Sequence, residues 1–66
     1  MKVTLRALRV NRGLTQKEAA ERLNITPRTL QYWEMNRTFP TTKQLMKICE
    51  AYECGIGDIF LPKELG

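Results

Sequence analysis

The sequence predicts a single all-α domain. Helix-capping residues recur along the chain, apolar residues repeat at helical spacing, and no segment alternates apolar and polar residues in the manner of a strand. A chain of 66 residues has room for one small core, so residues 1–66 are expected to form one domain. Hydrophobic residues make up 42% of the chain, which is too many for a disordered protein.

The first two helices are predicted from their ends. Residues 4–12 carry leucines on one face, and Gly13 stops this helix because glycine adopts the left-handed conformation readily. The second helix begins at Thr15, which forms a capping box with Glu18: each side chain accepts a hydrogen bond from the backbone N–H of the other residue. This helix is expected to end at Asn24, since asparagine tolerates a positive φ.

The third helix is expected over residues 27–35. Thr26 is a good N-cap, and the φ of Pro27 is already fixed at a value that suits the first helical turn. Leu30 and Trp33 are three residues apart and therefore lie on the same side of the helix. We expect this side to face the core, which leaves the opposite side exposed.

Two further helices complete a compact five-helix architecture. Thr41 and Gln44 form a second capping box, which starts a helix that runs to Tyr52. A short fifth helix is predicted over residues 56–61, ending before Pro62. The apolar stripe of the fourth helix repeats at helical spacing and consists of Leu45, Ile48, Cys49 and Tyr52.

The charge of the chain is positive and unevenly distributed. The formal net charge is +4, with eleven basic and seven acidic side chains. Nine of the basic and three of the acidic residues lie within residues 1–43, so residues 44–66 are slightly acidic. A basic region of this kind is typical of a protein that binds a polyanion with one face, and an ordinary solvated surface is the alternative.

Several chemistries are excluded by the residue types present. The chain has no histidine, which rules out Ser–His–Asp and Cys–His catalysis and every zinc site that contains histidine. Cys49 and Cys54 are too few for an all-thiolate zinc site. Free thiols are the favoured state of these two cysteines, and a disulfide across the helix end between them is the alternative. We expect no enzyme activity, no metal and no cofactor.

The expected setting is the cytoplasm. No stretch approaches the roughly 18 consecutive apolar residues that a membrane span requires. The N-terminal residues turn polar too early for the core of a signal peptide. A core of this size also leaves little space for a buried small molecule, so neither a membrane nor a small-molecule ligand is expected as a partner.

The second and third helices are separated by only three residues, Asn24, Ile25 and Thr26. A connection this short imposes a sharp angle, which is the geometry of a helix-turn-helix. The small side chain of Ala20 allows the third helix to cross the second closely. Held at this angle, the third helix can enter a DNA major groove with its exposed side.

The run from Gly13 to Thr26, followed by Thr29-Leu30, Trp33-Glu34 and Pro40, resembles the lambda/434-type Cro and repressor helix-turn-helix family, also called the XRE family. The similarity covers nearly the whole chain. It implies a lambda-repressor-like domain that binds operator DNA as a symmetric dimer, usually as a transcriptional repressor.

The resemblance also implies roles for particular residues. Arg9 and Glu34 occupy the positions of an ion pair between the first and third helices. The family's base-reading positions are occupied here by Pro27, Arg28, Thr29 and Tyr32. The positions expected to contact phosphates are occupied by Gln16, Lys17, Thr26, Gln31, Asn36, Arg37 and Thr38.

Alternatives remain open for three of these residues. Gln16 could be a solvated residue of the first turn. Arg28 could contact a phosphate in place of reading guanine. Tyr32 could pack on Phe39 or the loop, in place of contacting a thymine methyl group or a phosphate. Pro27 has no polar side-chain atom, so direct readout at its position is weakened.

The chain also departs from the family pattern at three glycine positions. Asn24 and Asn36 stand where glycine is usual, and asparagine accepts the required positive φ at little cost. Glu53 stands where a helix-ending glycine is common. It is therefore expected either to adopt a left-handed conformation at a cost of about 1 kcal/mol, or to belong to a last turn that is built differently.

The predicted function is sequence-specific binding of double-stranded DNA. We favour a repressor of a phage, a mobile element or its own operon, which binds a palindromic operator as a dimer. An activator, a restriction-system controller or an antitoxin on the same scaffold is the nearest alternative, and a protein-interaction module without DNA binding is the next. Candidate dimer contacts, which could instead complete the core, are Ile56, Phe60, Leu61 and Leu65.

Overall fold

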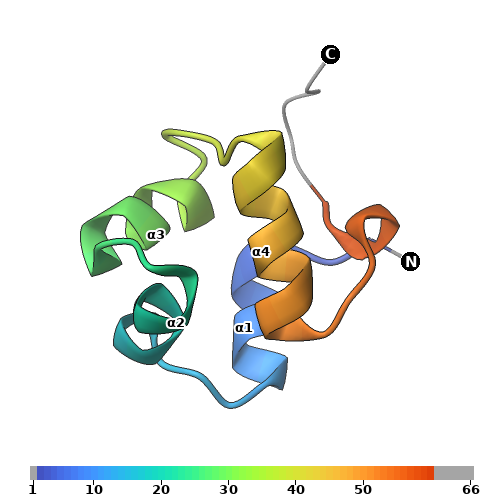
Figure 1. Ribbon diagram of the computed structural model, residues 1–66, viewed down its shortest axis with the longest axis horizontal. Helices are drawn as coiled ribbons and strands as arrows, with labels where there is room; N and C mark the ends of the chain where they lie inside the picture. The colour runs from blue at the N-terminus through green and yellow to red at the C-terminus, as the bar shows by residue number, and fades with distance from the viewer. Residues whose placement is uncertain (1, 61–66) are drawn as a thin grey trace.

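The computed structural model describes residues 2–60, which form four α-helices and one turn of 3₁₀ helix (Figure 1). The predicted all-α class is confirmed within these residues. In chain order the elements are α1 (Leu5–Asn11), α2 (Gln16–Leu23), α3 (Pro27–Glu34), α4 (Thr42–Tyr52) and η1 (Ile56–Asp58). In the described part of the chain, no helix is both long enough and apolar enough to cross a bilayer.

The N-terminus of each α-helix is capped by a threonine. Thr15 and Thr41 form the two predicted capping boxes, with Glu18 and Gln44 as their partners. Thr26 accepts a hydrogen bond from a backbone N–H in the first turn of α3, and Thr4 does the same for α1. Because these hydroxyls satisfy backbone N–H groups that the helix itself leaves open, the sequence defines where each helix begins.

Left-handed residues end two of the helices. Asn24 closes α2 with a φ of 58°, and Glu53 closes α4 with a φ of 52°. Of the two arrangements expected for Glu53, the structure has the left-handed one. Arg12 supports this end of α4, because its Nε donates to the Tyr52 carbonyl at 2.9 Å. Asn36 also has a positive φ, 62°, in the loop after α3.

The hydrophobic core lies among the four α-helices, each of which contributes buried apolar residues. Leu30 and Trp33 are buried, as expected for the inner side of α3. Ala20 is buried in α2, which packs on both α3 and α4. The connection between α2 and α3 is as short as predicted, and α3 lies at the left edge of the molecule with one side toward solvent (Figure 1). The buried apolar residues are Leu5, Leu14, Ala19, Ala20, Leu23, Leu30, Trp33, Leu45, Ile48, Tyr52 and Ile59.

The fifth helix predicted over residues 56–61 is shorter in the structure and of another type, and Leu61 lies outside the described residues. The structure has a single 3₁₀ turn at Ile56–Asp58, followed by extended backbone. Ile59 forms a parallel bridge with Val3. The N–H of Val3 donates to the Asp58 carbonyl at 2.7 Å, and the N–H of Phe60 donates to the Val3 carbonyl at 2.8 Å. These bonds to the N-terminal segment replace the helical ones, and Gly57 disfavours a helix here as well.

Candidate nucleic-acid interface

The exposed side of α3 presents the residues predicted to read bases. Pro27 and Arg28 are exposed, and Thr29 and Tyr32 are partly exposed. Leu30 and Trp33 anchor the opposite side of the same helix in the core. A two-turn helix fixed in this way presents its outer side chains on a rigid support.

The first turn of α3 is held by two threonines. Thr26 Oγ1 accepts a hydrogen bond from the backbone N–H of Thr29 at 3.2 Å, and the two hydroxyl oxygens are 2.9 Å apart. Both hydroxyls are therefore engaged with each other. A hydroxyl can still accept or donate one further bond, so Thr29 retains some capacity toward a base edge.

Tyr32 links two arginines on the exposed surface. Arg28 Nη1 lies 3.4 Å from the Tyr32 hydroxyl, and the guanidinium carbon of Arg37 lies 5.8 Å from the centre of the Tyr32 ring. The second contact is a cation–π interaction. We call these three residues the Arg28–Tyr32–Arg37 cluster. It combines two permanent positive charges with an aromatic ring, a combination suited to bases and phosphates.

Sequence reasoning did not predict the contact between Arg37 and the Tyr32 ring. The two residues are five positions apart, which would place them on different sides of a continuous helix. The contact arises because α3 ends and Asn36 turns the chain back with a positive φ. The asparagine was the signal in the sequence from which this return could have been inferred.

The loop after α3 was expected to bind a phosphate with Arg37 and the adjacent backbone. In the structure the backbone N–H groups of this loop point back toward the helix. That of Arg37 donates to the Tyr32 carbonyl at 2.9 Å, and that of Asn36 donates to the Trp33 carbonyl at 3.2 Å. The N–H of Thr38 makes a longer bond, 3.5 Å, to the same Tyr32 carbonyl. These three backbone N–H groups are therefore already paired with carbonyls of α3, which leaves the side chains of the loop to face solvent.

Beneath this surface lies a charged network that joins three helices. Arg9 Nε is 2.7 Å from Glu34 Oε2, and Arg9 Nη2 is 3.1 Å from Glu34 Oε1. The side chains of Arg9 and Glu34 are only 10% and 4% exposed. The hydrogen bond to Glu34 is the main cause that raises the pKa of Arg9, which stays protonated. The structure thus forms the ion pair that the family resemblance implied.

Gln16 belongs to the same network. Its Nε2 donates to Glu34 Oε1 at 3.0 Å, so the first residue of α2 is tied to the last residue of α3. The amide has a second N–H that this bond does not use. Gln16 is partly exposed, and the next residue, Lys17, is exposed on the first turn of α2. The structure therefore brings the first turn of α2 next to the end of α3.

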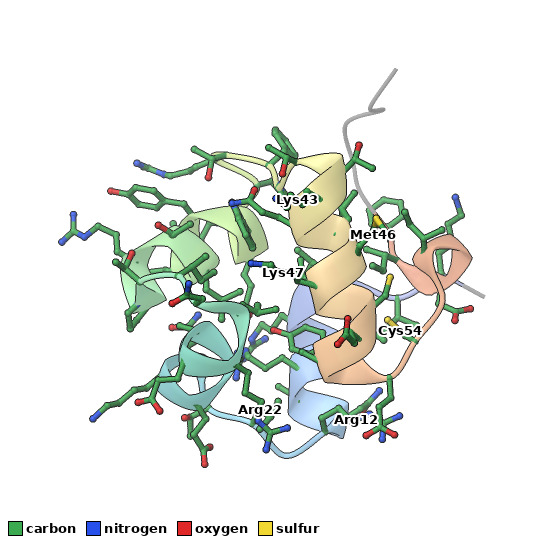
Figure 2. All side chains as sticks on the ribbon, in the orientation of Figure 1. Arg12, Arg22, Lys43, Met46, Lys47 and Cys54 are labelled. Carbon is green, nitrogen blue, oxygen red and sulfur yellow. The ribbon has the colours of Figure 1, made fainter. Side chains whose placement is uncertain are left out.

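Three other exposed basic residues were not predicted as site residues. Arg22 and Lys47 line a surface groove together with Glu50 and Ala51, and Lys43 lies one turn before Lys47 on α4 (Figure 2). In the sequence these three residues are visible only as part of the net positive charge. Within the described residues, no group of three or more His, Cys, Asp or Glu side chains could hold a metal ion.

Comparisons with known proteins agree with this geometry. A helix-turn-helix family, HTH_3, matches residues 5–59 of the chain. The crystal structure of the clp gene regulator ClgR from C. glutamicum superposes with a TM-score of 0.76 and 30% sequence identity, over 82% of this chain and 70% of that one. No curated protein matches the sequence. The family match spans most of the chain and includes α2 and α3, the two helices that form the turn. The chain therefore belongs to the XRE-type helix-turn-helix family of DNA-binding proteins.

Proposed function

We propose that this protein binds double-stranded operator DNA sequence-specifically, with α3 in the major groove, and that it represses transcription as a dimer. The observation that carries the proposal is the Arg28–Tyr32–Arg37 cluster on the exposed side of a helix that the core holds from behind. Family membership and the likeness to ClgR, a gene regulator, support the regulatory role. The cytoplasm is the proposed setting.

Arg28 and Arg37 have different roles in this proposal. Arg28 lies near the N-terminus of α3, from which it can reach the base edges and donate two parallel hydrogen bonds to a guanine. Arg37 lies in the loop beyond α3 and binds a backbone phosphate. Tyr32 contacts both guanidinium groups, that of Arg28 through its hydroxyl and that of Arg37 through its ring.

The remaining proposed phosphate contacts lie in the first turn of α2, at Thr26 and Gln31, and in the loop after α3. Gln16, held by Glu34, uses its second amide N–H, and Lys17 adds a charge beside it. In the loop after α3, the phosphate contacts come from side chains, and Asn36 and Thr38 are both exposed there. Phosphate contacts of this kind fix the register of a protein on the duplex without selecting its sequence.

The proposed dimer places two copies of α3 about 34 Å apart, one turn of DNA. Its proposed contact surface includes Ile56 and Phe60, which are 57% and 46% exposed. The two other predicted contact residues, Leu61 and Leu65, lie outside the described residues. Sedimentation of the protein with and without a palindromic duplex tests this part of the proposal.

The test of DNA binding compares Arg28→Ala with Arg37→Ala. The operator is first obtained by selecting bound fragments from a random DNA pool, which also returns the symmetry and spacing of the site. Arg28→Ala should lose about 1–3 kcal/mol of discrimination between operator and random DNA. Arg37→Ala should weaken binding to both DNAs equally. It should also make the binding constant less dependent on salt concentration, by the amount that corresponds to about one phosphate contact.

Arg6→Ala is the matched control, because Arg6 is an exposed arginine of α1 outside the proposed interface. Equal effects of Arg28→Ala and Arg37→Ala on both DNAs would overturn the assignment of roles. Failure of the wild-type protein to select any DNA would overturn the function itself.

A further inference from the structure

Cys49 and Cys54 are brought together by the way α4 ends. Glu53 is left-handed, and the backbone N–H of Cys54 donates to the Cys49 carbonyl at 3.0 Å. A hydrogen bond that spans five residues across a left-handed residue defines a Schellman motif, in which the side chains at these two positions characteristically touch. The contact is usually apolar; here each partner is a thiol.

The two thiols have similar surroundings in the structure. Both are free, both are half-buried, and both pack on the edge of the core. Burial, and after it the neighbouring Cys49 thiol, raises the pKa of Cys54. Among the described residues, no group of three or more His, Cys, Asp and Glu side chains that could hold a metal ion includes this pair.

We propose that Cys49 and Cys54 form a covalent modification site that small-molecule disulfides oxidise to an intramolecular disulfide. A disulfide requires two Cα atoms about 4.4–6.8 Å apart. The hydrogen bond from the Cys54 N–H to the Cys49 carbonyl, 3.0 Å long, holds these two residues next to each other. The unfolded chain has to lose conformational entropy to bring the same two residues together, whereas the folded chain holds them in place.

The reaction consists of two thiol–disulfide exchanges. The thiolate of one cysteine attacks a sulfur of the oxidant, which forms a mixed disulfide and releases one small thiolate. The thiolate of the second cysteine then attacks the protein sulfur of the mixed disulfide, which closes the bridge and releases the second small thiolate. Overall, two protein thiols are oxidised, one small disulfide is reduced to two thiols, and the two protons pass to the released thiolates.

This site is separate from the proposed DNA interface. Cys54 lies on the far side of α4 from α3, close to η1 (Figure 2). A bridge would fix the last turn of α4 to the segment that leads into η1, beside the exposed Ile56. The proposal therefore does not rest on DNA binding, and either one can fail without the other.

The test is a redox titration of the full chain in mixtures of oxidised and reduced glutathione. The buffer is mildly alkaline because exchange requires a thiolate, and equilibration is followed over hours. Samples are quenched with acid and weighed by mass spectrometry, and the fraction bridged gives an effective concentration for the two thiols. The same titration is then repeated in urea at a concentration that unfolds the chain, as judged by Trp33 fluorescence.

We expect a product lighter than the reduced chain by two hydrogen atoms, without bound glutathione. The effective concentration of the two thiols in the folded protein should exceed the value in urea by at least about tenfold, since only the folded chain holds the pair in place. Cys49→Ser and Cys54→Ser should each retain one glutathione group, because no second thiol can release it. A folded-state value equal to or below the value in urea would overturn the proposal. So would a wild-type protein that retains two glutathione groups or forms disulfide-linked dimers.

Discussion

Glu34→Gln removes a negative charge from the interior while keeping the shape of the side chain. The Glu34 carboxylate accepts three hydrogen bonds, two from Arg9 at 2.7 and 3.1 Å and one from Gln16 at 3.0 Å. A glutamine at this position has one acceptor oxygen and turns an NH₂ group toward a donor. Arg9 would then be a charge that is 10% exposed and has no carboxylate beside it.

The expected loss is about 3–5 kcal/mol in the free energy of unfolding, the usual cost of removing one partner from a buried ion pair. This is a large part of the roughly 5–15 kcal/mol that stabilises a typical domain. Arg9 keeps one neutral partner, because its Nη1 donates to the Leu14 carbonyl at 2.8 Å. This remaining bond favours the lower half of the range.

The assay is urea unfolding followed by the fluorescence of Trp33, which is buried and is the only tryptophan in the chain. Glu53→Gln is the control, since Glu53 and Arg12 form a surface ion pair of 3.5 Å with side chains 72% and 43% exposed. This variant should cost less than about 1 kcal/mol. Replacing Arg9 and Glu34 together with Met and Leu should recover most of the stability lost in Glu34→Gln.

A loss for Glu34→Gln no larger than that for Glu53→Gln would refute this reasoning. It would mean that water reaches the Arg9–Glu34 pair and screens it as it does a surface pair. The double replacement could also cost as much free energy of unfolding as the two single replacements added together. That result would contradict a direct interaction between the Arg9 and Glu34 side chains.

Three further changes test other parts of the fold. Tyr52 is 1% exposed, its hydroxyl has no hydrogen-bond partner among the described residues, and burial raises its pKa to about 12. Tyr52→Phe should therefore stabilise the protein by about 1 kcal/mol. Above about pH 10 the unfolded chain releases the Tyr52 proton, whereas the folded chain retains it, so the wild-type protein loses stability there. Measurements of unfolding against pH should show that Tyr52→Phe removes this loss. Glu18 has a lowered pKa because the Thr15 backbone N–H donates to it, so the folded state binds its proton less tightly. Its contribution is present near neutral pH and is lost as the pH falls through this lowered pKa; acid unfolding of Glu18→Gln should lack that component. Glu53→Gly should gain up to about 1 kcal/mol in urea unfolding, because glycine adopts the left-handed conformation without strain, and a loss would show that the Arg12 contact matters more.

Helix starts were predictable because each is determined by neighbouring residues. Thr15, Thr26 and Thr41 cap helices in the structure as their sequence contexts indicated. The end of the chain was not predictable in this way. Residues 56–59 take their conformation from a bridge to Val3, more than fifty positions earlier in the chain, and local propensity contains no information about such a partner.

In the candidate site, too, some features could be predicted from the sequence and others could not. The short connection before Thr26 and the buried positions of Leu30 and Trp33 follow from spacing, so the exposed side of α3 could be identified from the sequence. The contacts within that surface could not. Tyr32 meets Arg37 only because the chain reverses after α3, and Gln16 meets Glu34 only because α2 and α3 cross. The roles of these residues toward DNA remain predictions.

The most direct test of the central claim is an NMR titration of the protein with a mixed-sequence duplex at low ionic strength. The account predicts that the backbone amide signals of Arg28, Thr29 and Tyr32 shift as DNA is added. The signals of Cys54 and Gly57, on the far side of α4, should stay in place. Shifts confined to the far side, or unchanged signals from α3 throughout the titration, would contradict the account.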